Sequence, residues 1–133
     1  MRAGFYGHMY RLFAGLVPET EPRTVRNETE GWVRQSVSFM RAHYAEQITV
    51  GDAAKHVGID RSHFTRTFTR AIGMPPMAYL QKLRMDRGSD LLRGTSLSVT
   101  EIALTVGYPD LYSFTRAFRN RFGMSPSKFR EET

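Results

Sequence analysis

Two arginines hold equivalent places in a repeated stretch of this sequence. Residues 62–76 read SHFTRTFTRAIGMPP and residues 112–126 read YSFTRAFRNRFGMSP, so that Phe-Thr-Arg-x-Phe and Gly-Met-x-Pro recur. Arg66 and Arg116 end the two Phe-Thr-Arg triplets. A guanidinium group presents N–H donors in a rigid planar fork, which suits paired acceptors such as phosphate oxygens or the O6 and N7 atoms of guanine. A unit written twice in a short chain indicates two copies of one binding surface.

The residues around these arginines separate into two faces when they are placed on a helix. With a period of about 100° per residue, Phe64 and Phe68 fall on one side and Arg66 on the other. The second copy behaves in the same way, with Phe114 and Phe118 inside. We therefore predict an aromatic face that packs into a core and an outward face of hydroxyl groups and arginines. The outward residues are Ser62, Thr65, Arg66 and Thr69 in the first copy and Tyr112, Thr115, Arg116 and Arg119 in the second.

Signals for a short helix and a tight turn precede each copy. Thr49 and Asp52 have the spacing of a capping box, in which each side chain accepts a hydrogen bond from the other residue's backbone amide. Gly58 then marks the end of that helix. Ser98, Glu101 and Gly107 repeat the pattern before the second copy. The sequence thus predicts helix-turn-helix units over about residues 49–72 and 98–122, with second helices at 62–72 and 111–122.

The segments between and before these units also have a helical pattern. Residues 76–92 begin with a proline, which favours a helix start, and carry apolar residues from Met77 to Leu92. A further apolar stripe predicts a helix over 29–46 with Thr29 as its N-cap. The expected fold is all-α, with two helix-turn-helix subdomains joined by a long central helix in a domain of residues 29–133.

Residues 1–17 form an amphipathic pattern with a wide apolar face, and residues 18–28 contain prolines and mixed charge without a period. We interpret the first segment as a helix and the second as a linker. Three interpretations of the helix stay open: it packs on the downstream domain, it pairs with another chain in a dimer, or it ends an upstream sensor or dimerisation domain.

Charge favours a polyanionic partner. The chain of 133 residues carries a formal net charge of +6, with 19 Lys and Arg against 13 Asp and Glu. Residues 111–130 contain five basic side chains and no acidic one: Arg116, Arg119, Arg121, Lys128 and Arg130. Residues 31–133, which carry both copies of the repeat, hold 15 basic and 9 acidic side chains and therefore the whole excess.

Catalytic and metal chemistry finds no support in the residue pattern. There is no cysteine, and the four histidines have no metal-binding spacing such as HExxH. No GxSxG elbow or GxxxxGKS phosphate loop occurs. We expect no catalytic residue, metal or cofactor. Without a signal peptide or a run of ~20 apolar residues, the expected protein is a non-enzymatic cytoplasmic one.

The outward residues divide by the contact that we expect each to make with double-stranded DNA. Short hydroxyls and arginines permit close approach to base edges, whereas other cations contact phosphates. The alternative is that Arg66 and Arg116 belong to a solvated or salt-bridged scaffold. For Gln81, Lys82 and Arg84 we expect a solvated helix face. Predicted base contacts are Ser62, Thr65, Arg66, Tyr112, Ser113, Thr115 and Arg116; predicted phosphate contacts are Arg70, Arg119, Arg121 and Lys128.

With these residues identified, the chain resembles the AraC/XylS family of bacterial transcription regulators over about residues 31–131. The match rests on ITVGDAAKHVGIDRSHFTRTFTRAIGMPPMAYLQKLRMDRGSDLL and on LSVTEIALTVGYPDLYSFTRAFRNRFGMSPSKFR. The family pattern appears in the second half as Ala103, Val106-Gly107-Tyr108, Phe114-Thr115-Arg116-Ala117-Phe118, Gly123-Met124-Ser125-Pro126 and Phe129-Arg130. Two positions depart from the family pattern. Ser62 is small where some members have a large side chain, and Pro75 replaces the usual serine.

The resemblance implies a seven-helix, homeodomain-like domain whose two recognition helices enter successive major-groove segments on one face of DNA. It also implies RNA polymerase as a partner, a nucleoid-associated location and, in many members, an upstream sensor domain. Because the two units repeat within one chain, the target should be non-palindromic and cover roughly 20 base pairs.

Two other protein classes compete with a DNA-binding regulator. A helical protein-interaction module would use the same outward faces on an acidic partner and bind DNA incidentally. A DNA-repair enzyme with a similar domain would need alkyl-accepting cysteines, which the sequence lacks. The leading prediction is a sequence-specific regulator of transcription.

The predicted helix phase can be tested at Phe118. If this ring is buried, Phe118→Ala should lower the free energy of unfolding by roughly 3–5 kcal/mol, because the truncation leaves a cavity. Urea unfolding followed by circular dichroism measures the change. A near-neutral effect would contradict the assignment of the inward face.

Overall fold

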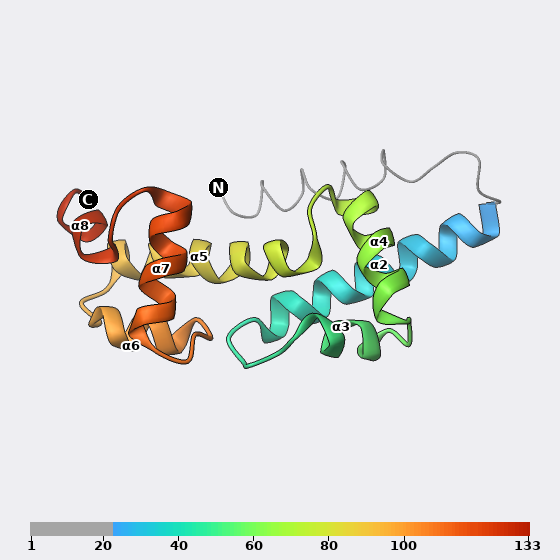
Figure 1. The fold of residues 1–133 in the computed structure, drawn as a ribbon, viewed down its shortest axis with the longest axis horizontal. Coiled ribbons are helices and arrows are strands. Elements are labelled where there is room, and N and C mark those ends of the chain that lie inside the picture. The colour runs from blue at the N-terminus through green and yellow to red at the C-terminus, as the bar shows by residue number, and fades with distance from the viewer. Residues whose placement is uncertain (1–22) are drawn as a thin grey trace. The chain divides into compact units, whose positions relative to one another are not determined.

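In a computed structural model, the backbone of residues 23–133 and the side chains from residue 27 are described, and this part of the chain is helical without a β-strand (Figure 1). This confirms the predicted all-α class. The described helices are α2 (Arg23–His43), α3 (Val50–His56), α4 (Arg61–Ile72), α5 (Pro76–Gly94), α6 (Val99–Thr105), α7 (Leu111–Phe122) and α8 (Pro126–Glu131). None of these helices is long and apolar enough to cross a membrane.

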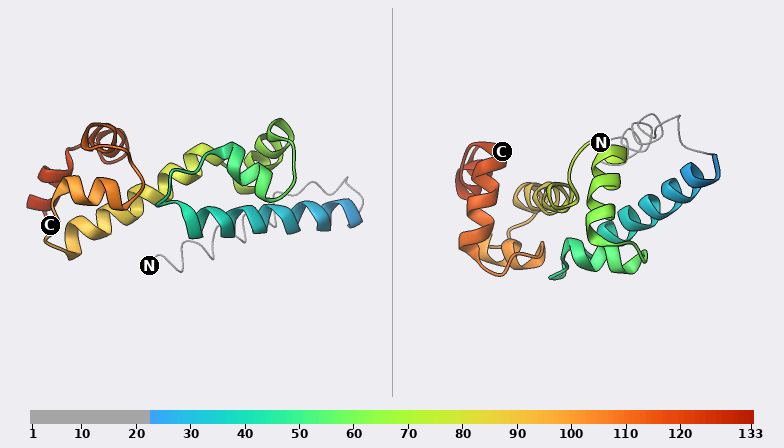
Figure 2. Two further views of the ribbon diagram at one scale, coloured as in Figure 1. Left: turned by 90° about the horizontal axis from the view of Figure 1, so that it is seen from below. Right: turned by 45° about the vertical axis from the view of Figure 1, so that its right-hand side comes forward.

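The chain divides into two compact units, each with one pair of helices from the repeat. The first unit contains the described residues up to Met40 together with Thr49–Tyr79, and the second contains Arg41–Ile48 and Leu80–Thr133. Helices α3 and α4 are in contact in the first unit, as are α6 and α7 in the second. In each pair the second helix crosses the first (Figure 2). The two predicted helix-turn-helix pairs are therefore present.

Capping boxes begin α3 and α6 as predicted. The Asp52 amide donates to the Thr49 hydroxyl over 3.0 Å, and the Thr49 amide donates to the Asp52 carboxylate over 2.8 Å. Ser98 and Glu101 form the same pair of bonds before α6. These bonds satisfy amide donors that the first helical turn leaves without partners.

Gly107 ends α6 in a conformation and a space that require glycine. Its φ of +103° lies in the left-handed region, and a Cβ built there would stand 2.5 Å from the carbonyl oxygen of Tyr44. The side-chain amide of Gln47 also donates to the Gly107 carbonyl over 2.7 Å. The segment after α2 thus packs directly on the turn of the second unit.

In the first unit, the aromatic residues of α4 pack into the core. Phe64 and Phe68 have no exposed surface, and their ring centroids lie 5.5 Å apart. Trp32 of α2 covers Phe64 at 5.6 Å, and Tyr79 meets Phe68 edge-on at 5.8 Å. Burial of Phe64 and Phe68 leaves the opposite side of α4 for solvent or a partner.

The second unit repeats this packing around α7. Phe114 and Phe118 are fully buried, and Phe118 contacts Phe129 of α8 edge-on at 5.2 Å. A Cβ built on Gly88 of α5 would lie 3.0 Å from the Phe114 ring, so α5 approaches α7 closely. The buried residues around these rings are Met85, Leu91, Leu92, Ile102, Ala103, Val106 and Tyr108.

Two cations of α5 are buried, which contradicts their predicted place on a solvated helix face. Lys82 is 9% exposed and Arg84 is 8% exposed, whereas Gln81 is exposed. Arg84 donates from Nε to the Tyr44 carbonyl over 2.8 Å and from Nη2 to the Glu46 carbonyl over 3.0 Å. Both carbonyls belong to the turn that follows α2. Arg84 is therefore a structural residue of the second unit.

The helix predicted over residues 29–46 differs from α2 at both ends. Helix α2 begins at Arg23, so residues 23–28 of the predicted linker are helical and Thr29 is not an N-cap. No proline follows Pro22 in this stretch, and a mixed-charge sequence can continue a helix on a solvated side. Helix α2 ends at His43, before the predicted end at residue 46. Met77, an apolar residue of the predicted central helix, is 48% exposed. The predicted helix over residues 1–17 lies outside the described residues.

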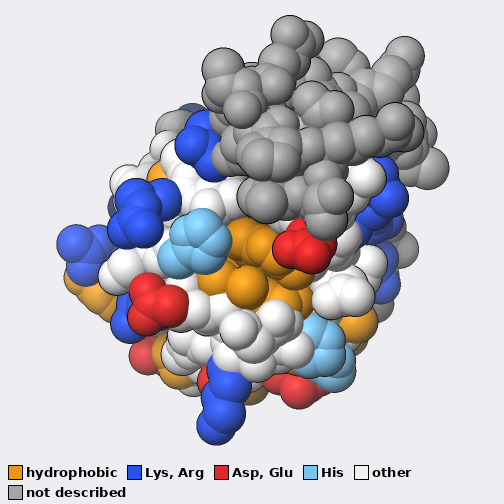
Figure 3. Space-filling model, turned by 90° about the vertical axis from the view of Figure 1, so that its right-hand side faces the viewer, with side chains coloured by type: hydrophobic (Ala, Val, Ile, Leu, Met, Phe, Trp, Pro, Cys, Tyr) orange, Lys and Arg blue, Asp and Glu red, His pale blue; other side chains and the backbone are white. Residues whose placement is uncertain are grey.

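The surface is not uniformly cationic. On the face drawn in Figure 3, hydrophobic side chains reach the surface and His, acidic and basic side chains surround them.

Tyr108 provides a test of the core of the second unit. Its hydroxyl is buried and forms no hydrogen bond within the described chain, while burial raises the pKa of the hydroxyl and keeps it neutral. Tyr108→Phe removes this unsatisfied group, so the free energy of unfolding should stay within ~1 kcal/mol or increase. Tyr108→Leu should destabilise, because it removes ring contacts to Phe114 and Arg84 at 5.7 Å. Urea unfolding compares the two variants, and a marked loss in Tyr108→Phe would reveal a partner for the hydroxyl.

Candidate nucleic-acid interface

Helix α4 exposes a polar face opposite its buried phenylalanines. Ser62 and Arg66 are exposed, and Thr65 is half-buried. The Thr69 hydroxyl donates to the Thr65 carbonyl over 2.7 Å, so its hydrogen is already used within the helix. Among the described residues, Arg66 forms no ion pair with a carboxylate. Its five N–H donors are available to an external acceptor.

Helix α7 exposes a similar face with larger side chains. Tyr112 is 74% exposed and Arg116 is exposed, while Thr115 is half-buried between them and the core. Within the described part of the chain, Arg116 also lacks an ion pair with a carboxylate. Neither Arg66 nor Arg116 is therefore a salt-bridged scaffold residue. The alternative that these arginines are only solvated stays open.

The N-caps hold the first turns of both recognition helices. Asp60 accepts from the amides of Ser62 and His63 over 3.1 and 3.3 Å. Asp110 accepts from the Ser113 amide over 2.8 Å and from the Ser113 hydroxyl over 2.5 Å. The hydrogen bond from the Ser113 hydroxyl, and to a lesser extent the one from its amide, hold the pKa of the Asp110 carboxyl below its ordinary value. Carboxylates at both positions also suit the positive end of the helix dipole.

This cap limits what Ser113 can do at an interface. A serine hydroxyl has one hydrogen to donate, and Asp110 accepts it. The remaining lone pairs of the Ser113 oxygen can accept a hydrogen bond from a base amino group. Of the predicted base contacts in the second unit, Ser113 is thus restricted to acceptor chemistry.

The predicted phosphate contacts differ in their surroundings. Arg119 and Lys128 are exposed and, within the described chain, form no ion pair with a carboxylate. Arg70 is exposed near the end of α4, where it already interacts with other groups of the protein. Arg121 approaches Asp86 of α5, with Nη2 3.5 Å from the carboxylate.

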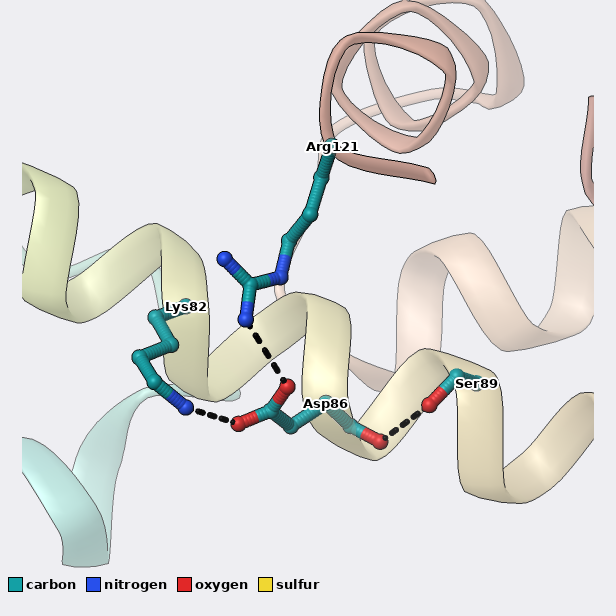
Figure 4. A network of polar contacts seen from close by, with 4 residues as sticks. All are labelled: Lys82, Asp86, Ser89 and Arg121. Atoms are coloured by element: carbon teal, nitrogen blue, oxygen red, sulfur yellow. Dashed lines mark hydrogen bonds and ion pairs between the residues drawn. The ribbon is translucent and has the colours of Figure 1, made fainter. Parts of the chain in front are cut away.

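Asp86 is the centre of a polar network beneath α7 (Figure 4). Lys82 Nζ lies 2.6 Å from one carboxylate oxygen, and Arg121 approaches the other. The Ser89 hydroxyl donates to the Asp86 backbone carbonyl over 2.9 Å. Side chains of Lys82 and Asp86 are 10% and 19% exposed, whereas that of Arg121 is 41% exposed. The less exposed pair of Lys82 and Asp86 therefore directs the more exposed guanidinium of Arg121.

Each unit brings its own predicted base contacts onto one helical face, and the structure adds two exposed residues to those predicted from the sequence. Leu111 is 41% exposed and Arg61 is exposed at the first positions of α7 and α4. Both lie one helical turn before a predicted contact, Thr115 or Thr65, so helix phase alone was enough to identify them.

Other site chemistry is not evident in the described chain. Within residues 23–133, no group of three or more His, Cys, Asp or Glu side chains could hold a metal ion. His43 bonds to Glu46 over 2.6 Å, and His56 stacks on Phe39 at 4.3 Å. These two histidines serve local packing and hydrogen bonding.

Comparison with known proteins gives a family match over the repeated region. A helix-turn-helix domain model matches residues 53–132. The Msm operon regulatory protein of Streptococcus mutans is 33% identical over 129 residues, which are 95% of this chain and 46% of the relative. The lactose operon transcription activator of Staphylococcus xylosus is 38% identical over 98 residues, 74% of this chain and 35% of the relative. The chain spans less than half the length of these two relatives.

Solved structures share the fold. The C-terminal domain of AraT, a response regulator from Geobacillus stearothermophilus, aligns with a TM-score of 0.75 and 27% identity, covering 77% of this chain and 85% of that domain. The DNA-binding domain of AdpA, a global transcriptional factor, was solved in complex with a target DNA. It aligns with a TM-score of 0.73 and 27% identity, covering 75% of this chain and 90% of that domain. The second of these was solved with the type of ligand that the outward faces were predicted to bind.

Acid should weaken the N-cap of α7. The lowered pKa of Asp110 means that its contribution to stability is present above the ordinary value of 3.8 and is lost as the pH falls through the lower folded value. Asp110→Asn keeps a capping oxygen without an ionisable group. The difference in free energy of unfolding between the parent and this variant should be constant near neutral pH and shift against the parent below pH 3.8. Urea unfolding across pH measures it, and a constant difference throughout would contradict the lowered pKa.

Proposed function

Because the chain belongs to the AraC/XylS family of transcription regulators, we propose that it binds specific sequences in double-stranded DNA and regulates transcription nearby. The observation that supports this most strongly is the duplicated recognition surface. Arg66 and Arg116 are exposed on the second helix of each unit and lack carboxylate partners in the described chain. The major groove admits such a helix and offers guanine acceptors that match the arginine fork.

The proposed base contacts follow the two exposed faces. In the first unit, Arg66 pairs with guanine while Ser62 and Thr65 allow close approach to neighbouring base edges. In the second unit, Arg116 has the corresponding role. Its neighbours Tyr112, Ser113 and Thr115 complete the contacts, with Ser113 acting as an acceptor because its hydrogen is held by Asp110.

The proposed phosphate contacts fix the position of the protein on the duplex. Arg119 and Lys128 are the most direct candidates, because they are exposed cations at the second unit. Arg70 is the candidate of the first unit. Arg121 can reach a phosphate while Asp86 orients it, but the same carboxylate reduces its net attraction for DNA.

We further propose an asymmetric target of roughly 20 base pairs, since two different recognition helices repeat within one chain. The first three residues of α4 are Arg61, Ser62 and His63, whereas those of α7 are Leu111, Tyr112 and Ser113. Different side chains at the helix start favour different bases in the two halves of the target.

The regulatory context is also a proposal. The two relatives are named as regulators of operons, and we propose operon control here, exerted through contact with RNA polymerase on the bacterial nucleoid. Residues 1–17 are proposed to support dimerisation directly or as the end of a sensor domain. The competing function is that of a protein-interaction module. Such a module needs no contact with base edges, so it would not explain the two duplicated arginine faces.

Selection of genomic fragments tests the proposed function. The protein should enrich a small set of fragments that share an asymmetric motif at physiological salt. Enrichment without sequence preference would favour the protein-interaction module instead. Sequencing of the bound fragments also identifies the neighbouring genes.

Arg116→Ala should then cost ~1–3 kcal/mol of binding to the selected site, with little change on random DNA, because it removes a base contact. Arg119→Ala should weaken binding to both and lower the salt slope by about one, because it removes a phosphate contact. Fluorescence anisotropy over a range of salt concentrations separates the two effects. Arg116→Lys is the matched control, since it keeps the charge and loses the fork; equal losses on both DNAs from Arg116→Ala would exclude base reading.

A further inference from the structure

The first turn of α7 exposes two large side chains whose surfaces are mostly carbon. Leu111 is 41% exposed and Tyr112 is 74% exposed, and they are the first two residues of the helix. A single exposed leucine is ordinary on a protein surface. Here two such residues adjoin at the helix end that helix-turn-helix proteins direct at base edges.

The equivalent turn of α4 has the opposite character. Counting back from the first buried phenylalanine of each helix, Arg61 and Ser62 correspond to Leu111 and Tyr112. Arg61 and Ser62 are both exposed, one with a guanidinium group and the other with a hydroxyl group. The two recognition helices therefore meet their partners with different chemistry in the first turn.

Leu111 and Tyr112 belong to the same face as the cations of α7. Leu111 lies one turn before Thr115, and Tyr112 lies one turn before Arg116. Arg116 and Arg119 are exposed on this face, which makes its charge complementary to DNA. The third residue of the turn, Ser113, gives its hydroxyl hydrogen to Asp110. A base edge that meets this turn therefore contacts chiefly the carbon atoms of Leu111 and Tyr112.

One base edge in the major groove presents an apolar group that matches this turn. Thymine carries a C5-methyl group there, and apolar side chains recognise it by contact. Resting on the proposed DNA-binding function, we propose that Leu111 and Tyr112 read thymine methyl groups. The half of the target bound by α7 then depends on those methyl groups, and the half bound by α4 does not. Leu111 becomes a specificity-determining residue of the second unit.

Replacement of thymine by deoxyuridine tests the proposal, because it removes the methyl group and preserves base pairing. The starting duplex is a selected genomic site, and the α7 half is the half in which Arg116→Ala relaxes base preference. Deoxyuridine there should weaken binding about two- to fourfold per contacted methyl group. The same replacement in the α4 half should leave affinity unchanged.

Variants connect the effect to the side chains. Leu111→Ala should weaken binding to the thymine duplex and lose all or most of the deoxyuridine effect, since the two changes remove one contact. Tyr112→Ala should behave in the same way at a neighbouring base pair. Arg61→Ala is the matched control from α4 and should keep the full deoxyuridine effect. Circular dichroism verifies that the variants fold, as expected for exposed positions.

The outcomes separate this proposal from the function on which it rests. If binding is sequence-specific but the α7 half contains no thymine, or shows no deoxyuridine effect, the proposal that α7 reads methyl groups is overturned. The proposed function as a regulator then still holds. An undiminished deoxyuridine effect in both Leu111→Ala and Tyr112→Ala assigns the methyl contact elsewhere and also overturns it. Binding without any sequence preference overturns both the proposed function and this inference.

Discussion

Burial of the phenylalanines on one side of each recognition helix fixes how both helix-turn-helix units present their outward side chains. Phe64 and Phe68 in α4 and Phe114 and Phe118 in α7 have no exposed surface. Because a helix has fixed angular spacing, burial of these rings sets the direction of every other side chain on it. Arg66 and Arg116 face outward for that reason.

The caps add a second level of positioning at the helix start. Asp60 and Asp110 hold the first amides of α4 and α7, and Asp110 also takes the hydroxyl hydrogen of Ser113. The fold therefore already uses the one hydrogen-bond donor of the Ser113 side chain, which the sequence pattern assigned to base contact. What remains exposed in that turn of α7 is the apolar pair Leu111 and Tyr112, and this gives the second unit its own chemistry.

Polar groups of α5 join the second unit together instead of forming a solvated face. Arg84 donates to carbonyls of the segment after α2, and Asp86 pairs with Lys82 and Arg121. Removing Asp86 would leave the Lys82 ammonium group, which is 10% exposed, without this carboxylate, so the Lys82–Asp86 pair is structural. The ion pair of Arg121 with Asp86 of α5 consequently competes with its proposed contact with a phosphate.

The helix-turn-helix pairs, their capping boxes and the phase of both recognition helices could be predicted from the sequence, because local signals and a repeated aromatic spacing encode all three. The sequence also indicated the family and the outward position of Arg66 and Arg116. The start of α2 at Arg23, the burial of Lys82 and Arg84 and the approach of Arg121 to Asp86 became evident in the folded structure. The burial of Arg84 and the approach of Arg121 to Asp86 depend on contacts between residues far apart in the chain, such as that of Arg84 with Tyr44, which no local pattern records.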